Sequence, residues 1–187
     1  MEPIYRLHKE QGIVKCTSLF DLNLLREIQE NIPPTNKFQK VNVSKKPYFN
    51  QSEMANVYWI RAKDSELSRL IFSYMQKVVN LIEHIYEVKI EKDLGYNITT
   101  YRQGEGYKLH IDRSYNDAFF AQRDIGIVVG LTSQYSGGEL VFPKQNYGTK
   151  VRENEIVFFP AYFTHPHEVT KVESGVRSVI VCWVKLK

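Results

Sequence analysis

The chain has 187 residues, of which 43% are hydrophobic and 25% are charged, and its formal net charge is +4. This length allows a substantial core, so we expect a single domain over residues 1–187 that needs no disulfide bond. The basic residues form no stripe for phosphates, and no apolar run approaches the roughly 18 residues of a membrane span. These features argue against nucleic acid and membrane as partners.

The N-terminal sequence and the cysteines favour a cytoplasmic location. Residues 1–6 (MEPIYR) lack the apolar core of a signal peptide. Cys16 and Cys182 lie near opposite ends of the chain without the spacing of a metal or redox motif, which fits a reducing compartment and a structural role. The sequence gives no indication of oligomeric state.

An amphipathic helix is the first element that the sequence predicts. Ser18, with Asp21 three residues later, is a helix-starting pattern, and leucine and isoleucine then recur at helical spacing over residues 24–32. The two prolines at 33–34 end this helix. Residues 35–63 are polar but contain many aromatic side chains, and they predict short strands joined by a long loop. Two interpretations of this loop stay open, a lid over a site or a loop that its aromatic residues anchor to the core.

A second, longer helix is expected to begin near Asp64 or Ser65. Apolar residues recur along it from Leu67 to Ile85 on a wide face, so it should pack against a sheet. We therefore expect residues 1–93 to form a helical support and lid region.

After Leu94 the sequence changes to short runs rich in β-branched and aromatic residues, separated by glycine and proline. Such runs predict a closed or double-sheet β architecture. Because the helices are expected before the strands, we predict an α+β fold with a double-stranded β-helix (jelly-roll, cupin-like) catalytic core over residues 94–187 and the N-terminal helices packed on one outer face. The predicted strands cover residues 96–101, 107–112, 125–132, 139–142, 155–159, 164–172 and 176–184.

His110 and Asp112 end one of these predicted strands. Side chains two residues apart on a strand point to the same face, so the imidazole and the carboxylate should lie together. One further imidazole would complete the 2-His-1-carboxylate set that holds non-heme Fe(II) and leaves three coordination positions open. A His-x-Asp pair is a weak signal by itself, and the downstream sequence has to support it.

His167 is the candidate for the second imidazole, and it lies far enough along the chain for several strands to intervene. His165 is an alternative, because it shares a predicted strand face with His167. Arg177 follows ten residues after His167, a distance that a hairpin through a turn at 173–175 would convert into adjacency. The strand of Arg177 is strongly apolar, so an inward guanidinium would need an anion such as a dicarboxylate. An outward arginine paired with a surface glutamate is the other interpretation.

Together these motifs resemble the Fe(II)- and 2-oxoglutarate-dependent dioxygenases, and within them the prolyl 4-hydroxylase group. The resemblance rests on YRQGEGYKLHID at 101–112, GGELVFP at 137–143, EIVFFP at 155–160, and PHEV at 166–169 followed by GVR at 175–177. It covers about residues 94–184 with specific motifs, and the preceding helices fit the usual layout of the family less specifically.

This resemblance implies that His110, Asp112 and His167 hold Fe(II). It also implies that Arg177 binds the distal carboxylate of 2-oxoglutarate. The implied reaction uses O2, converts 2-oxoglutarate to succinate and CO2, and hydroxylates an unactivated C–H bond, with ascorbate as an accessory reductant.

Two tyrosines also match pocket positions of the family. Tyr101 matches a tyrosine that assists the distal carboxylate, although a strand aromatic filling the core would explain it too. Tyr107 corresponds to another pocket tyrosine. The resemblance favours His167 over His165 as the iron ligand, because the Glu-Val pair after His167 fits the family pattern.

The resemblance favours a prolyl residue in a protein or peptide as the substrate, as in procollagen-proline 4-dioxygenase. Tyr58, Trp59 and Tyr115 could line a groove for a proline ring, and core packing explains the same residues. A free amino acid or another small metabolite is the alternative substrate, with Arg113 among the charged anchors. We take these four residues, from two loops that flank the predicted site, as candidate substrate contacts.

Other functional classes fit the sequence less well. Related halogenases have a small residue where this chain has Asp112, so hydroxylation is favoured over halogenation. The strand that begins with Arg177 lacks the second arginine typical of alkylation-repair dioxygenases, which argues against a nucleic-acid-modifying enzyme. A non-catalytic cupin-like binding module would not need Tyr101, His110, Asp112, His167 and Arg177 together.

Overall fold

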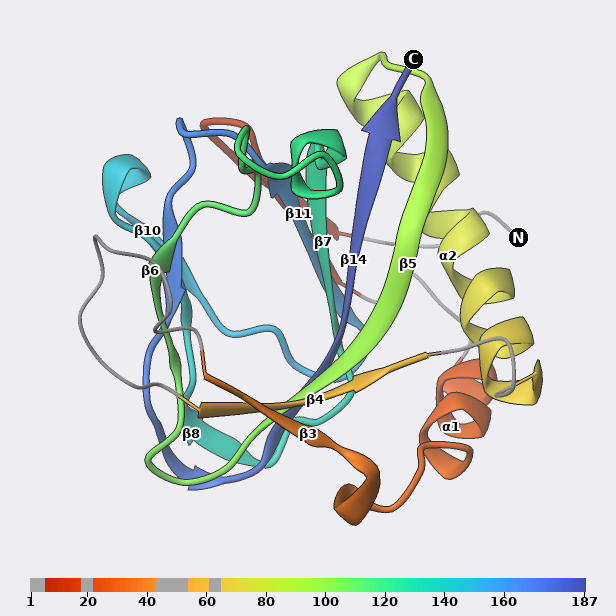
Figure 1. Ribbon diagram of the computed structural model, residues 1–187, viewed down its shortest axis with the longest axis vertical. Coiled ribbons are helices and arrows are strands. Elements are labelled where there is room, and N and C mark those ends of the chain that lie inside the picture. The colour runs from red at the N-terminus through yellow and green to blue at the C-terminus, as the bar shows by residue number, and fades with distance from the viewer. Residues whose placement is uncertain (1–5, 18–21, 43–53, 61–64) are drawn as a thin grey trace.

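The computed structural model of the chain describes residues 6–17, 22–42, 54–60 and 65–187. Two opposed antiparallel sheets dominate this part of the chain, and two α-helices lie against the larger sheet (Figure 1). Within the described residues the larger sheet has eight strands, in the spatial order β1 (Arg6–Glu10), β2 (Ile13–Thr17), β11 (Glu155–Pro160), β7 (Ile125–Gly130), β14 (Arg177–Leu186), β5 (Ile90–Tyr101), β4 (Met54–Trp59) and β3 (Gln39–Asn42).

The smaller sheet lies opposite the middle of the larger one. Its order in the described chain is β10 (Tyr147–Thr149), β9 (Leu140–Phe142), β12 (His167–Val169) and β6 (Tyr107–His110), and a separate pair joins β13 (Val172–Gly175) to β8 (Tyr135–Gly137). The helices are α1 (Leu22–Glu30) and α2 (Ser65–Tyr86), with short 3-10 turns η1 (Thr35–Lys37), η2 (Phe120–Gln122) and η3 (Pro143–Gln145).

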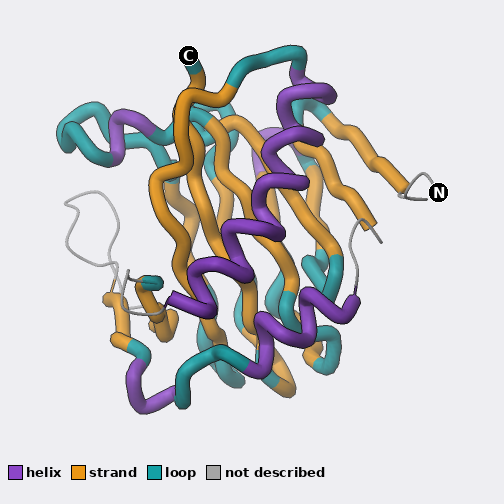
Figure 2. Tube along the Cα trace, turned by 90° about the vertical axis from the view of Figure 1, so that its right-hand side faces the viewer, coloured by secondary structure: helices purple, strands orange, loops and turns teal. Residues whose placement is uncertain are grey.

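Both α-helices cover the outer face of the larger sheet (Figure 2). Their apolar faces join the sheet in one buried cluster, because residues at three- and four-residue spacing share one side of a helix. The helix residues of the cluster include Leu25, Ile28, Leu70, Ile71, Tyr74, Val78 and Ile82, and the strand residues include Ile98, Ile127, Ile156 and Ile180.

No helix in the described ranges is long and apolar enough to cross a membrane.

The larger sheet is buried on both faces, which explains why its central strands are apolar almost throughout. On β14, Val179 belongs to the inner cluster between the sheets and Ile180 to the outer cluster under the helices. On β11, Val157 and Phe159 alternate in the same way with Ile156 and Phe158. The predicted α+β class, with a double-stranded β-helix core and helices on one outer face, is confirmed.

The N-terminal part of the chain differs from the prediction. The hairpin of β1 and β2 precedes the first helix, and β2 pairs with β11, so the larger sheet begins far upstream of residue 94. Residues 39–42 and 54–59 add two more strands next to β5, which itself begins at Ile90. The proposed division at residue 93 therefore describes the helices but not the sheet, because strands distant in sequence complete it. The helix-starting residues Ser18, Asp21 and Asp64 lie outside the described residues.

The expected hairpin between the strands of His167 and Arg177 is wrong. β12 belongs to the smaller sheet, where it pairs with β6 and β9, whereas β14 pairs with β5 and β7 in the larger sheet. The residues between them form β13, which pairs with β8. The two residues therefore approach the same interior from opposite sheets.

Candidate functional site

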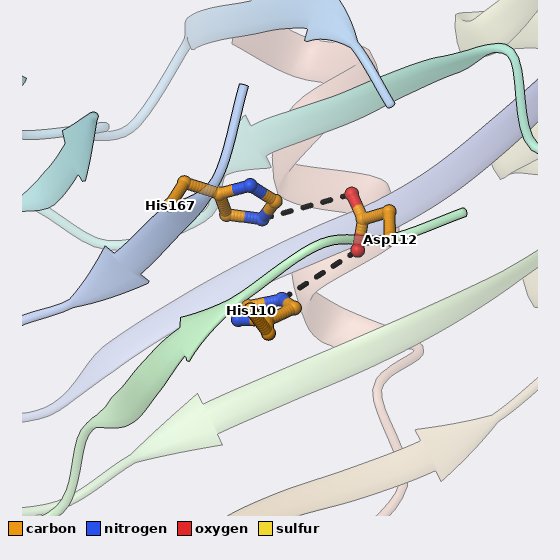
Figure 3. Close-up of side chains that lie close together, drawn as sticks. All are labelled: His110, Asp112 and His167. Carbon is orange, nitrogen blue, oxygen red and sulfur yellow. Dashed lines mark ion pairs between the residues drawn. The ribbon is translucent and has the colours of Figure 1, made fainter. Parts of the chain in front are cut away.

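His110, Asp112 and His167 converge at one end of the smaller sheet (Figure 3). His110 on β6 and His167 on β12 are direct partners in the antiparallel register, which brings their ring centroids to 4.3 Å. β6 ends at His110, and the chain then carries Asp112 across to face both rings. Asp112 Oδ1 lies 3.5 Å from His110 Nε2 and Asp112 Oδ2 lies 3.6 Å from His167 Nε2.

Backbone carbonyls fix which ring nitrogen of each histidine is free. His110 Nδ1 donates to the Lys108 carbonyl at 2.7 Å, and His167 Nδ1 donates to the His165 carbonyl at 3.1 Å. A carbonyl can only accept, so each neutral ring carries its hydrogen on Nδ1 and a lone pair on Nε2. Both lone pairs lie on the side of the Asp112 carboxylate, which is the orientation that a metal ligand needs.

The protonation states also suit a divalent cation. Burial, with a smaller contribution in the same direction from the neighbouring His110, lowers the pKa of His167 to about 4. Burial acts to raise the pKa of Asp112, but the imidazoles of His167 and His110 outweigh it and hold that pKa well below its usual range. At neutral pH the site thus offers a neutral His167 imidazole and an ionised carboxylate. Two imidazoles and one carboxylate on one side of an ion form the facial set typical of non-heme Fe(II).

Arg177 lies in the interior between the sheets and is only 1% exposed. It begins β14 directly opposite Tyr101 on β5, and its guanidinium carbon lies 5.1 Å from the centre of the Tyr101 ring. Its Nε and Nη1 atoms are buried without a hydrogen-bond partner in the described protein. Burying guanidinium N–H groups without a partner is unfavourable, and an anion that accepted hydrogen bonds from them would remove the cost. The Arg177 guanidinium therefore points into the interior and is not paired with a surface glutamate of the described chain.

Two tyrosines flank this guanidinium. Burial raises the pKa of Tyr101 to about 12 against the opposing charge of Arg177, so its hydroxyl stays protonated and can donate to an anion. Tyr135 on β8 donates to the Val151 carbonyl at 3.0 Å, and burial raises its pKa, again with Arg177 opposing. Gly138 is required beside them, because a Cβ there would approach Arg177 Cδ to 2.9 Å and its φ is +60°.

A cavity of about 480 Å³ connects the triad of His110, Asp112 and His167 with Arg177. Tyr101 and Tyr107 both line it, and burial raises the pKa of Tyr107. The remaining wall is largely apolar and comes from both sheets, so an ion pair formed inside would be poorly screened. Its apolar lining residues include Val57, Ile127, Val128, Leu140, Phe159, Val169, Val179 and Val181.

The four predicted substrate residues do not all reach this cavity. Trp59 lines it and is 39% exposed, and Arg113 lines it while pairing with Asp124. The prediction that Tyr58 contacts the substrate is wrong. Because successive strand residues alternate, Tyr58 points to the opposite face of β4 from Trp59 and packs in the outer core. Tyr115 also differs from the prediction, because it does not line the cavity. Its side chain is 69% exposed and lies beside the Arg113 guanidinium.

His165 does not join the triad. It precedes β12 and turns its ring toward the N-terminal hairpin, where Nε2 donates to the Gln11 carbonyl at 2.9 Å. The expectation that it shares a strand face with His167 is wrong, because the strand begins only at His167.

Two residues of the cavity or the anion site, Trp183 and Tyr135, were not predicted from the sequence. Trp183 shares the inner face of β14 with Arg177 at even spacing, a signal that could have found it. Arg123 lies over the Trp183 ring at 3.5 Å and donates to the Asp112 carbonyl at 3.4 Å. Tyr135 lies two residues before the GGELVFP motif, and only the pairing of β8 with β13 brings it to Arg177.

A sequence model of the 2OG-Fe(II) oxygenase superfamily matches residues 96–185, which include all three residues of the triad and Arg177. A PKHD-type hydroxylase of Synechococcus sp. (strain CC9311) is 32% identical over 84 residues, covering 43% of this chain and 36% of that protein. A PKHD-type hydroxylase of Prochlorococcus marinus (strain MIT 9515) is 29% identical over 128 residues, covering 66% of this chain and 56% of that protein. The chain thus spans about a third to a little over half of the length of these relatives.

Solved structures show the same fold at low sequence identity. A prolyl hydroxylase from Trichoplax adhaerens, in complex with a peptide fragment of the hypoxia inducible factor oxygen degradation domain, has a TM-score of 0.73 and 17% identity, covering 93% of this chain and 83% of that one. A prolyl-4-hydroxylase from Pseudomonas putida has a TM-score of 0.71 and 17% identity, covering 94% and 93%. The viral collagen prolyl hydroxylase of Paramecium Bursaria Chlorella virus-1, in a 2OG complex, has a TM-score of 0.66 and 17% identity, covering 94% and 96%.

Proposed function

We infer that the chain belongs to the 2OG-Fe(II) oxygenase superfamily, whose sequence model matches residues 96–185, and from this premise we propose that it is prolyl 4-hydroxylase-like and hydroxylates a prolyl residue in a peptide or protein. The observation that carries the proposal is the pairing, across one cavity, of a converged His-Asp-His triad with a buried guanidinium that has unpaired N–H groups. The triad fits a divalent metal and the guanidinium fits a carboxylate. A reaction that needs Fe(II) and a dicarboxylate co-substrate uses both.

In this proposal His110, Asp112 and His167 hold Fe(II), and Arg177 binds the distal carboxylate of 2-oxoglutarate. Fe(II), O2 and 2-oxoglutarate supply the oxidising chemistry when bound, and succinate and CO2 leave as products. Arg177 neutralises the co-substrate charge and fixes its orientation, while the Tyr101 hydroxyl donates to the same carboxylate. The apolar wall of the cavity excludes water from the reacting groups.

The cavity also bears on the kind of substrate. At about 480 Å³ it is small for a site that must hold a co-substrate as well, so it suits one inserted side chain better than a whole large metabolite. Trp59 and Tyr107 line it and offer aromatic surface to a proline ring. The solved prolyl hydroxylases of the same fold, one of them with a bound peptide, support this choice. The two free cysteines, both buried, fit the cytoplasmic location that we propose with it.

The test is to incubate the purified protein with Fe(II), ascorbate, 2-oxoglutarate, air and a set of proline-containing peptides. Mass spectrometry reports the gain of one oxygen on proline, and succinate is quantified in the same tube. We expect matched amounts of hydroxyproline and succinate, and neither product from Asp112→Ala. Succinate formation without peptide oxidation would retain the 2-oxoglutarate chemistry and refute the prolyl substrate. Absence of succinate with every peptide and with free amino acids would refute the enzymatic proposal.

A further inference from the structure

His165 is a buried histidine that the proposed reaction does not use. It is 7% exposed, and its Nε2 lies 2.9 Å from the Gln11 carbonyl, far away in the sequence. Because a carbonyl only accepts, Nε2 carries the hydrogen, and Nδ1 of the neutral ring accepts from the Thr164 hydroxyl at 2.9 Å. Both ring nitrogens are therefore satisfied inside the protein, and the ring orientation is fixed.

The backbone of the same residue supports the proposed iron ligand. The His165 carbonyl accepts the hydrogen bond from His167 Nδ1 at 3.1 Å. Residues 161–166 connect β11 to β12 without belonging to a strand, so no sheet ladder fixes this carbonyl. The His165 N–H donates to the Tyr162 carbonyl at 3.0 Å, and the Gln145 side chain donates to the Thr164 carbonyl at 2.9 Å. The side-chain bond from His165 to Gln11 adds a direct tie between residue 165 and the hairpin of the larger sheet.

The turn that receives His165 is held from several sides. Gln11 and Gly12 both have positive φ, at 44° and 83°, as the tight hairpin between β1 and β2 requires. The Tyr86 hydroxyl on α2 donates to the Gly12 carbonyl at 2.6 Å. A Cβ at Gly12 would approach His165 Nε2 to 3.2 Å, so any other residue there would press against the ring. The acceptor for His165 is therefore rigid.

We propose that His165 is a positioning residue for the metal centre, and that it couples the N-terminal hairpin turn to the orientation of His167. The inference rests on the proposed function, because it takes His167 as a metal ligand. By holding the carbonyl at residue 165, the Gln11–His165 bond keeps His167 in the tautomer and orientation that present Nε2 to the metal. Loss of such an outer contact typically weakens metal binding by about 10- to 100-fold.

The experiment measures Co(II) affinity of the metal-free protein by absorption titration, together with its thermal midpoint. His165→Leu removes the donor to Gln11. His165→Gln keeps an amide N–H near the position of Nε2 and serves as the conservative variant. Val78→Ala truncates a buried residue of α2 on the far side of the larger sheet and controls for general destabilisation. We expect a 10- to 100-fold loss of Co(II) affinity in His165→Leu, recovery to within about 3-fold in His165→Gln, and unchanged affinity in Val78→Ala.

Co(II) affinity in His165→Leu equal to that of the original protein would overturn the inference. Equal losses in His165→Leu and Val78→Ala would also overturn it, because they would report general loosening. If His165→Leu does not fold, Gly12→Ala perturbs the same contact from the hairpin, and unchanged affinity there counts against the inference. His167→Ala distinguishes failure of the proposed metal site from failure of the positioning role. Normal Co(II) affinity in His167→Ala would refute the metal site itself. Loss of Co(II) affinity in His167→Ala, together with unchanged affinity in His165→Leu, would refute only the positioning role.

Discussion

Replacing Arg177 with methionine should separate the stability of the protein from its ability to bind 2-oxoglutarate. Two buried nitrogens of Arg177, Nε and Nη1, lack a partner, and each such polar group costs about 1–3 kcal/mol. Methionine removes both nitrogens and fills much of the same volume, at the loss of a cation–π contact with Tyr101 worth about 0.5–2 kcal/mol and of the electrostatic contacts with the Tyr101 and Tyr135 hydroxyls. The metal-free variant should therefore be as stable as the original protein or more stable by up to about 3 kcal/mol, although a fully buried residue has been changed.

The functional effect should have the opposite sign. A guanidinium that binds a carboxylate through two charge-assisted hydrogen bonds contributes at least about 3 kcal/mol, or roughly 100-fold in affinity. Arg177→Met should lose at least that factor in 2-oxoglutarate affinity. The co-substrate should raise the thermal midpoint of the original metal-loaded protein but not that of the variant.

Urea denaturation of the metal-free proteins and titration of 2-oxoglutarate into the Co(II)-loaded proteins provide the two measurements. Arg113→Met is the matched control, because it makes the same chemical change at an arginine that pairs with Asp124. It should destabilise the protein by about 2 kcal/mol, since the largely buried Asp124 carboxylate loses its charged partner and keeps only the Tyr162 hydroxyl and the Leu186 N–H. Destabilisation of the metal-free Arg177→Met variant would refute the conclusion that its guanidinium is unsatisfied, and unchanged 2-oxoglutarate affinity would refute its role as the anion site.

Three other predictions concern the triad and the cavity. Asp112→Ala should lower Co(II) affinity at least about 100-fold while circular dichroism shows an intact fold, and normal affinity would exclude the carboxylate as a ligand. Burial lowers the pKa of His167 to about 4 in the folded protein, below its value of 6.5 in the unfolded chain. As the pH falls from 6.5 to 4, His167 therefore binds a proton in the unfolded chain but not in the folded protein, and this favours unfolding. Metal-free stability should thus decrease by about 2 kcal/mol between pH 7 and pH 5, and His167→Gln should abolish that part of the urea-denaturation difference. Trp59→Ala should raise the KM for the peptide and leave the affinity for 2-oxoglutarate unchanged. Tyr115→Ala should change neither the KM nor the affinity by more than about 2-fold. Equal effects of the two substitutions on the peptide KM would contradict the placement of Trp59 in the cavity.

Patterns that act within one element could be predicted from the sequence. The spacing of apolar residues located α2, and the run YRQGEGYKLHID gave a strand that ends in His110 with Asp112 close behind. The apolar character of the strand around Arg177 indicated that this guanidinium would be buried. These features depend on the periods of helices and strands, which a sequence carries directly.

Alternation along a strand does not by itself say which face is inside when both faces are apolar. Tyr58 and Trp59 are adjacent aromatic residues, and only the pairing of β4 with β5 decided that Trp59 faces the cavity and Tyr58 faces the helices. The same limit applied to His165, which falls just before β12 and not on it.

What the sequence by itself determined was therefore the identity of the chemical groups and the local strands and helices that carry them. Tertiary structure alone decided that β1 and β2 join the larger sheet through β11, and that His167 and Arg177 face one cavity from opposite sheets. The physical reason is that strand pairing between distant segments depends on the whole set of competing partners, and no local period records it. The contact between the Gln11 turn and His165 arises from the same long-range pairing.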